Sequence, residues 1–94
     1  YLANLERLDA ALGELLAEID RLGLASRCYV IVSSDHGEAF GEHGSVKHAS
    51  TVYDELLRVP LLIKGPGVAP RTVGEPVTLM DLGPTILDIL RRRE

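Results

Sequence analysis

The chain has 94 residues, a hydrophobic content of 46% and a net charge of −4 at pH 7. Its length suits a single domain, whose core must be aliphatic because aromatic residues make up only 4%. The acidic balance argues against a nucleic-acid binder, which would show a basic patch, and no apolar run is long enough to cross a bilayer. With one cysteine, Cys28, the chain can form no internal disulfide.

The first predicted element is a long helix from Tyr1 to Leu22. Leucine and isoleucine recur here at spacings of three and four, which puts them on one stripe of an α-helix. Gly23 stands where helices commonly end. A strand follows at Cys28–Val32, and because it is apolar on both faces we expect it to lie inside a mostly parallel sheet.

The rest of the chain predicts a loop, a short helix, a second strand and a last helix. Residues 34–49 are polar and rich in Gly and His, and a short helix is expected to end at Leu57. Val59–Lys64 predicts the strand, and Met80–Arg91 the final helix. This order indicates an α/β fold. Since two strands do not form a stable sheet alone, we expect strands from elsewhere or self-association.

The predicted strand at Cys28–Val32 is followed closely by Asp35 and His36. In open α/β sheets, ligands bind at the carboxyl ends of the strands. A carboxylate and an imidazole are common ligands of divalent metals. Neighbouring side chains of an extended strand point to opposite faces, so the chain must turn before both can reach one ion, and Gly37 permits that turn. We therefore predict that Asp35 and His36 are metal ligands.

All three histidines of the chain lie within residues 36–48. His48 stands one loop away from the metal pair, where it could bind the other side of an anionic substrate, although a solvated loop explains it equally well. Lys47 is more simply explained as a solvent-exposed side chain. His43 is more simply explained as a turn residue that hydrogen-bonds the backbone.

Six short motifs follow one another along the chain. They are Val30–Glu38, Phe40–Gly44, Tyr53–Glu55, Arg58–Ile63, Gly65–Gly67 and Asp81–Leu87. Together they resemble the sulfatase family of the alkaline phosphatase superfamily over nearly the whole chain. The resemblance implies that the α/β fold is part of a three-layer α/β/α sandwich. It also implies that residues 1–94 are one segment of a catalytic domain whose front half lies upstream.

The resemblance implies metal-dependent hydrolysis of a small-molecule or glycan sulfate ester. Asp35 and His36 match the metal ligands of the family, which implies a divalent ion, calcium first, with manganese or zinc as alternatives. His48 matches the position that binds the transferring group and acts in catalysis, better than Lys47 does, so both are candidate substrate-binding residues. The formylglycine nucleophile of the family is expected upstream, because Cys28 is not followed by the x-Pro-x-Arg motif.

Two alternatives stay open. A histidine at position 48 also resembles the phosphodiesterases and phosphoryl transferases of the same superfamily, which act on phosphate esters. The chain could instead be a non-catalytic fragment or interaction domain. With two metal ligands and no nucleophile of its own, the isolated chain is expected to be inactive and to hold metal weakly.

Overall fold

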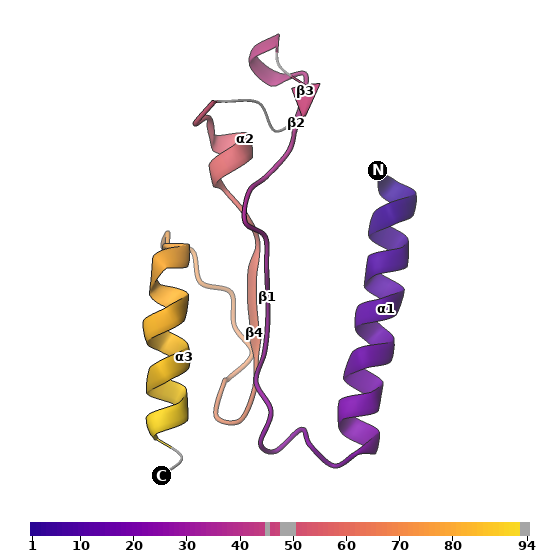
Figure 1. The fold of residues 1–94 in the computed structure, drawn as a ribbon, viewed down its shortest axis with the longest axis vertical. Coiled ribbons are helices and arrows are strands. Elements are labelled where there is room, and N and C mark those ends of the chain that lie inside the picture. Colours follow the sequence, from indigo (N-terminus) through magenta and orange to yellow (C-terminus); the bar gives the residue numbers. More distant parts are fainter. Residues whose placement is uncertain (45, 48–50, 93–94) are drawn as a thin grey trace.

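The computed structural model describes residues 1–44, 46–47 and 51–92. Its elements, in chain order, are α1 (Leu2–Arg21), β1 (Val30–Ser33), β2 (Ala39–Phe40), the 3₁₀ helix η1 (Glu42–Gly44), β3 (Val46–Lys47), α2 (Asp54–Leu57), β4 (Leu61–Lys64), the 3₁₀ helix η2 (Leu79–Asp81) and α3 (Leu82–Arg91) (Figure 1). The structure confirms the predicted order of helix, strand, helix, strand and helix. The predicted loop between the two main strands also forms a small hairpin, β2–β3.

Helix α1 ends where the glycine predicts. Gly23 has a φ of 68°, a left-handed conformation that glycine adopts without steric cost. The Gly23 amide donates to the Asp20 carbonyl at 3.0 Å. The Leu24 amide donates to the Ile19 carbonyl at the same distance. These two bonds satisfy carbonyls that the last helical turn would otherwise leave without partners, so the chain leaves the helix here.

Strands β1 and β4 form an antiparallel ladder, in which Ser33 at the end of β1 pairs with Leu61 at the start of β4. The sequence placed β1 in a mostly parallel sheet, and for its pairing with β4 that expectation is wrong. A parallel partner needs a crossover that carries the chain back to the other end of the sheet. Here the hairpin and α2 both lie beyond the carboxyl end of β1 (Figure 1). The chain thus enters β4 where it left β1, beside the turn that holds Asp35 and His36.

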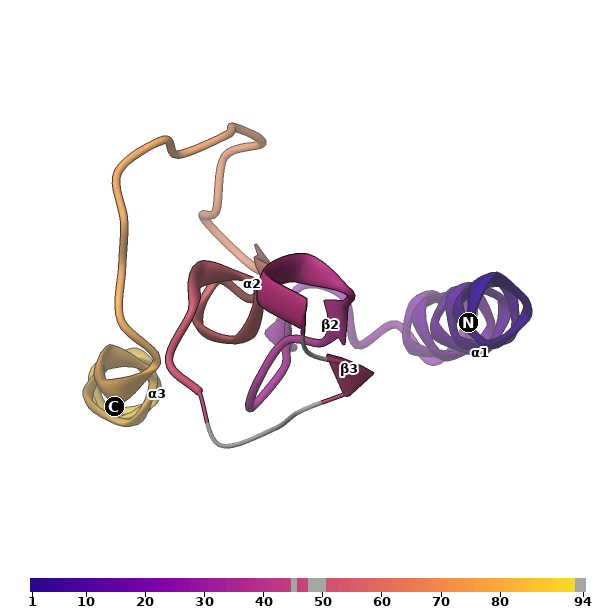
Figure 2. The ribbon, with the colours of Figure 1, turned by 90° about the horizontal axis from the view of Figure 1, so that it is seen from above.

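Helices α1 and α3 lie on opposite sides of the β1–β4 pair, as Figures 1 and 2 both show. Each helix has a row of half-buried residues at helical spacing. These rows are Leu12, Leu16 and Ile19 in α1, and Leu82, Thr85 and Ile89 in α3. The strand pair therefore stands between two helices, and the small upper part made of the hairpin and α2 continues beyond the end of the strands.

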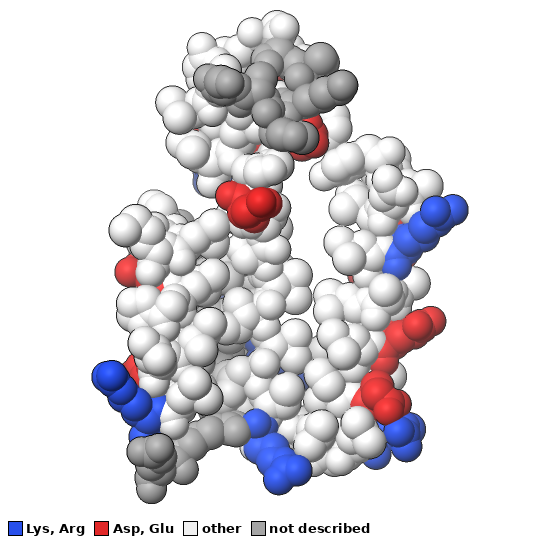
Figure 3. Space-filling view, in the orientation of Figure 1, with Lys and Arg blue, Asp and Glu red and all other residues white. Residues whose placement is uncertain are grey.

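The described part of the chain buries little apolar surface. Only Ala39 and Leu56 are buried among its residues, whereas Leu8 and Leu15 in α1 are more than half exposed. Most of the face seen in Figure 3 is uncharged, and acidic groups stand where the strand pair meets the upper part. An amphipathic helix in a protein gains most of its stability from packing its apolar face, and much of that face is uncovered here. None of the helices in the described ranges is long and apolar enough to span a bilayer.

Candidate metal and substrate site

The chain turns directly after β1, and this turn carries the predicted metal ligands. Ser34 Oγ donates to the His36 carbonyl at 2.7 Å. The His36 amide donates to Asp35 Oδ1 at 3.0 Å. These local bonds end the extended strand and bring His36 Nε2 to 3.8 Å from Asp35 Oδ1. The expectation that a turn brings the two side chains together is confirmed, and their role as metal ligands stays a prediction.

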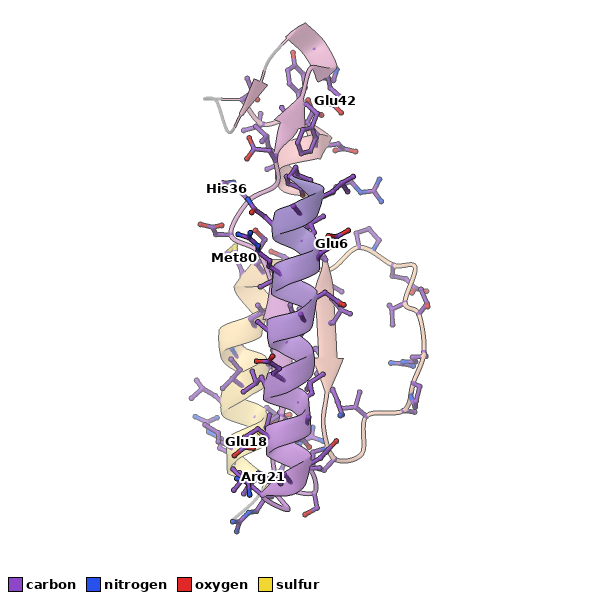
Figure 4. All side chains as sticks on the ribbon, turned by 90° about the vertical axis from the view of Figure 1, so that its right-hand side faces the viewer. Glu6, Glu18, Arg21, His36, Glu42 and Met80 are labelled. Carbon is purple, nitrogen blue, oxygen red and sulfur yellow. The ribbon has the colours of Figure 1, made fainter. Side chains whose placement is uncertain are left out.

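The backbone orients the imidazole of His36. Its Nδ1 lies 2.8 Å from the Gly37 carbonyl oxygen. Because a carbonyl can only accept a hydrogen bond, Nδ1 carries the proton, and in the neutral ring Nε2 carries the lone pair on the side of Asp35. The Gly37 carbonyl, followed by the Asp35 carboxylate, raises the pKa of His36 because both stabilise the imidazolium. Figure 4 shows His36 at this turn and Glu42 nearer the tip of the hairpin.

Asp35 and His36 present one carboxylate and one imidazole nitrogen to solvent, with side chains 88% and 48% exposed. This donor set suits a divalent cation. A hydrogen bond from Nδ1 to a carbonyl is also a usual support for a histidine that ligates through Nε2. Within residues 1–44, 46–47 and 51–92, no group of three His, Cys, Asp or Glu side chains could hold a metal. The pair therefore fits a cation as part of a site that needs ligands from outside this group.

The turn at residues 34–37, named the metal turn after its predicted role, is docked against α2 through Gly37. The Gly37 amide donates to the Leu56 carbonyl at 2.8 Å. A Cβ atom at position 37 would overlap the carbonyl oxygen of Glu55 and press on the Cα of Leu56. Glycine is therefore required here by the close approach of two backbones, and not by the turn itself, because Gly37 does not have a positive φ.

The hairpin has a tightly wound tip. Gly41, His43 and Gly44 have positive φ angles of 119°, 53° and 70°. Such a conformation is uncommon for histidine and costs energy that the surroundings must offset. The carboxylate of Glu42 reaches back to accept the Phe40 amide at 2.6 Å, which closes the turn from the other side.

His43 folds back from this tip onto the start of α2. Its Nδ1 lies 2.9 Å from Glu55 Oε1. Its ring stacks on Tyr53 with centroids 3.9 Å apart and planes 12° from parallel. The expectation that His43 hydrogen-bonds the backbone is therefore wrong, because a carboxylate takes that place. The hydrogen bond from His43 lowers the pKa of Glu55, since it favours the ionised carboxylate.

The structure says less about the two candidate substrate-binding residues, His48 and Lys47. His48 lies outside the described residues. Lys47 is placed by its backbone, which pairs with Ala39 at the base of the hairpin. The described chain therefore brings Asp35 and His36 together and puts the hairpin beside them, while the positions of both candidate side chains stay predictions.

Sequence reasoning did not find the contact between His43 and Glu55. The two residues are twelve positions apart, which matches neither a helical nor a strand spacing. The one available signal was that Phe40–Gly44 and Tyr53–Glu55 both belong to the motifs that resemble a known family. The contact itself depends on the left-handed turn at His43, which spacing does not reveal.

The sequence of this chain matches a known protein family. A family model for sulfatases matches residues 1–91. The chain therefore belongs to the sulfatase family, as the order of its motifs predicted.

Among the similar proteins are three sulfatases from different organisms. Arylsulfatase K of Bos taurus is 42% identical over 90 residues. The extracellular sulfatase SULF-1 homolog of Drosophila melanogaster is 38% identical over 89 residues, and choline-sulfatase of Rhizobium meliloti strain 1021 is 35% identical over 89. The matches cover 95%, 94% and 95% of this chain. They cover only 16%, 8% and 17% of those proteins, so the chain spans less than a fifth of their length. No solved structure matches the chain at comparable significance.

Proposed function

We propose that this chain is one segment of a metal-dependent sulfatase domain that hydrolyses sulfate esters, and that it supplies Asp35 and His36 to the metal. The observation that carries the proposal is the turn after β1. A carboxylate and an imidazole stand there 3.8 Å apart, with the histidine oriented by a backbone carbonyl, in a chain of the sulfatase family. The three relatives described above all carry the name of a sulfatase.

Each residue of the site has a separate task in this account. Asp35 and His36 would hold a divalent cation, whose positive charge would offset the negative charge that develops on the ester oxygens. The bond from His36 Nδ1 to the Gly37 carbonyl keeps Nε2 directed to that position. His48, which follows the hairpin in sequence, binds the sulfuryl group or donates a proton to the leaving oxygen. Lys47 is the second candidate for binding the anion.

The wider assignment follows from family membership. Residues 1–94 form one part of an alkaline phosphatase-like three-layer domain, and the two helices on opposite sides of the strand pair support that architecture (Figure 2). The proposed metal is calcium, with manganese or zinc as alternatives. The formylglycine nucleophile and the remaining metal ligands come from outside this chain. The substrate is a small-molecule or glycan sulfate ester, and the isolated chain is inactive because it holds only part of this machinery.

The test is hydrolysis of model esters by the protein at its natural full length. We expect p-nitrophenyl sulfate to be cleaved faster than p-nitrophenyl phosphate and bis(p-nitrophenyl) phosphate. Asp35→Ala and His36→Ala each remove a metal ligand, and the loss of several kcal/mol of stabilisation corresponds to a fall in turnover of about 100-fold or more. Asp9→Ala, on an exposed part of α1, is the matched control and should leave turnover unchanged.

Three results would contradict this account in different ways. Faster cleavage of the phosphate esters would favour the phosphodiesterase or phosphoryl transferase alternative. Full activity in Asp35→Ala with normal metal content would refute the ligand assignment. A full-length protein that cleaves none of these esters would favour a non-catalytic scaffold.

A further inference from the structure

Glu55 touches both halves of the proposed site through two different groups. Its backbone carbonyl lies directly against Gly37, so closely that a Cβ atom at Gly37 would overlap it. Its side chain reaches the other way and accepts the hydrogen bond from His43 Nδ1 at 2.9 Å. One residue of α2 therefore contacts the metal turn and also the hairpin that precedes His48 in sequence.

We propose that Glu55 is a positioning residue that holds the β2–β3 hairpin in register with the metal turn. This role rests on the proposed sulfatase function, because it concerns the distance between the metal ligands and the substrate group that follows the hairpin. Glu55 acts through His43 and Gly37, so it touches no substrate in this account. The hydrogen bond between the Glu55 side chain and His43 holds the hairpin in position. The contact between the Glu55 backbone and Gly37 holds the metal turn in position.

The low exposure of the Glu55 carboxylate distinguishes this contact from an ordinary surface ion pair. The Glu55 side chain is only 16% exposed, and its partner His43 is 52% exposed. The neighbouring carboxylate of Asp54 is 80% exposed and lies 3.9 Å from Arg58, the residue that directly follows the same helix. Both buried residues of the described chain, Ala39 and Leu56, lie in the segments that meet at this point. Pairs in which both side chains are exposed contribute little, but a contact between two segments in which one partner is largely shielded can help to fix their relative position.

The backbone conformation of His43 also supports a positioning role for Glu55. A left-handed histidine is unfavourable by itself and persists where its surroundings determine it. Here two contacts stabilise that conformation, namely the hydrogen bond to Glu55 and the stacking of the ring on Tyr53. A turn that only faced solvent would need neither contact. Glycine would then adopt the positive φ at position 43 at no steric cost, as it does nearby at Gly41 and Gly44.

The experiment is a double-mutant cycle in the full-length protein, built from His43→Ala, Glu55→Ala and the double variant. The measured quantities are kcat/KM for p-nitrophenyl sulfate, the Kd for calcium and the midpoint of urea unfolding. Asp54→Ala is the matched control, because it removes a carboxylate one residue away on the same helix. Glu55→Gln keeps a hydrogen-bond acceptor, and His43→Phe keeps the ring that stacks on Tyr53, so both serve if an alanine variant fails to fold.

We expect Glu55→Ala to lower kcat/KM about tenfold, because small misplacements of positioned groups cost factors of this order or more. The calcium Kd should stay within about twofold, since the backbone contact with Gly37 is intact. Adding His43→Ala to Glu55→Ala should lower kcat/KM little further, because both changes break the same contact. Glu55→Gln should recover much of the lost activity, whereas His43→Phe should not.

The role is overturned if Glu55→Ala lowers kcat/KM no more than Asp54→Ala does. It is also overturned if calcium affinity, stability and activity all fall together, since that pattern indicates a purely structural residue. A wild-type protein that cleaves no sulfate ester overturns the proposed function and this role together. An active wild type with unaffected Glu55 variants overturns only the role.

Discussion

Replacing Gly37 by alanine should damage the metal turn more than any other single methyl group added to this chain. A Cβ atom there would overlap the Glu55 carbonyl oxygen, and Leu56 Cα is also in close contact. Both obstacles belong to the backbone of α2, which cannot rotate away as a long side chain could. The hydrogen bond from the Gly37 amide to the Leu56 carbonyl, 2.8 Å long, would be stretched when the segments separate.

The steric overlap and the stretched hydrogen bond together determine the expected loss of stability. Forcing an extra carbon into a packed position costs typically ~1–3 kcal/mol. The loss of one backbone hydrogen bond costs about 1 kcal/mol net. Gly37→Ala should therefore lower the free energy of unfolding by ~2–4 kcal/mol. Because the shift occurs next to His36, calcium affinity should fall about tenfold or more.

Urea unfolding and calcium titration of the full-length protein measure the two effects. Gly13→Ala is the matched control, because a Cβ at Gly13 meets no atom within 4 Å among the described residues. Gly13 lies inside α1, where alanine is favoured over glycine by ~0.5–1 kcal/mol, so the control should be slightly stabilised. A Gly37→Ala protein as stable as the wild type, with unchanged calcium affinity, would show that α2 does not dock here as described.

Two smaller changes have equally definite outcomes. Tyr29→Phe removes the bond of 2.7 Å from the phenol to the Pro66 carbonyl and should cost about 1 kcal/mol of unfolding free energy in urea; no change would mean that water replaces the phenol. The pKa of Glu55 is lowered from its usual 4.5 in the folded protein, so its carboxylate stabilises the fold above that pH and this stability is lost as the pH falls through the lowered pKa. Urea midpoints should therefore drop between pH 5 and pH 3 more steeply in the wild type than in Glu55→Gln, and equal slopes would contradict the contact with His43.

The helices and the two main strands were predictable because local pattern determines them. Leucine spacing and Gly23 specify α1 and its end without help from the rest of the chain. An apolar run followed by Asp35 and His36 indicated a strand that ends in a turn, and the structure has that turn. Each of these features depends on residues within a few positions of one another.

Features that depend on distant residues were not predictable. The antiparallel direction of β4 depends on the path of the whole connection from Ser34 to Pro60, which no spacing in that loop encodes. The bond between His43 and Glu55 needs a left-handed backbone at His43 and a helix that begins only at Asp54. Gly37 was assigned to the turn, but its close contact with α2 became visible only when both segments were placed.

Calcium binding by the full-length protein tests the central claim most directly. Isothermal titration should show one calcium site in the wild type and in Asp54→Ala, whose carboxylate lies outside the proposed site. Asp35→Ala and His36→Ala should each weaken that binding about 100-fold, because each removes one ligand of the ion. Unchanged calcium affinity in both variants would contradict the claim that the turn after β1 holds the metal of a sulfatase.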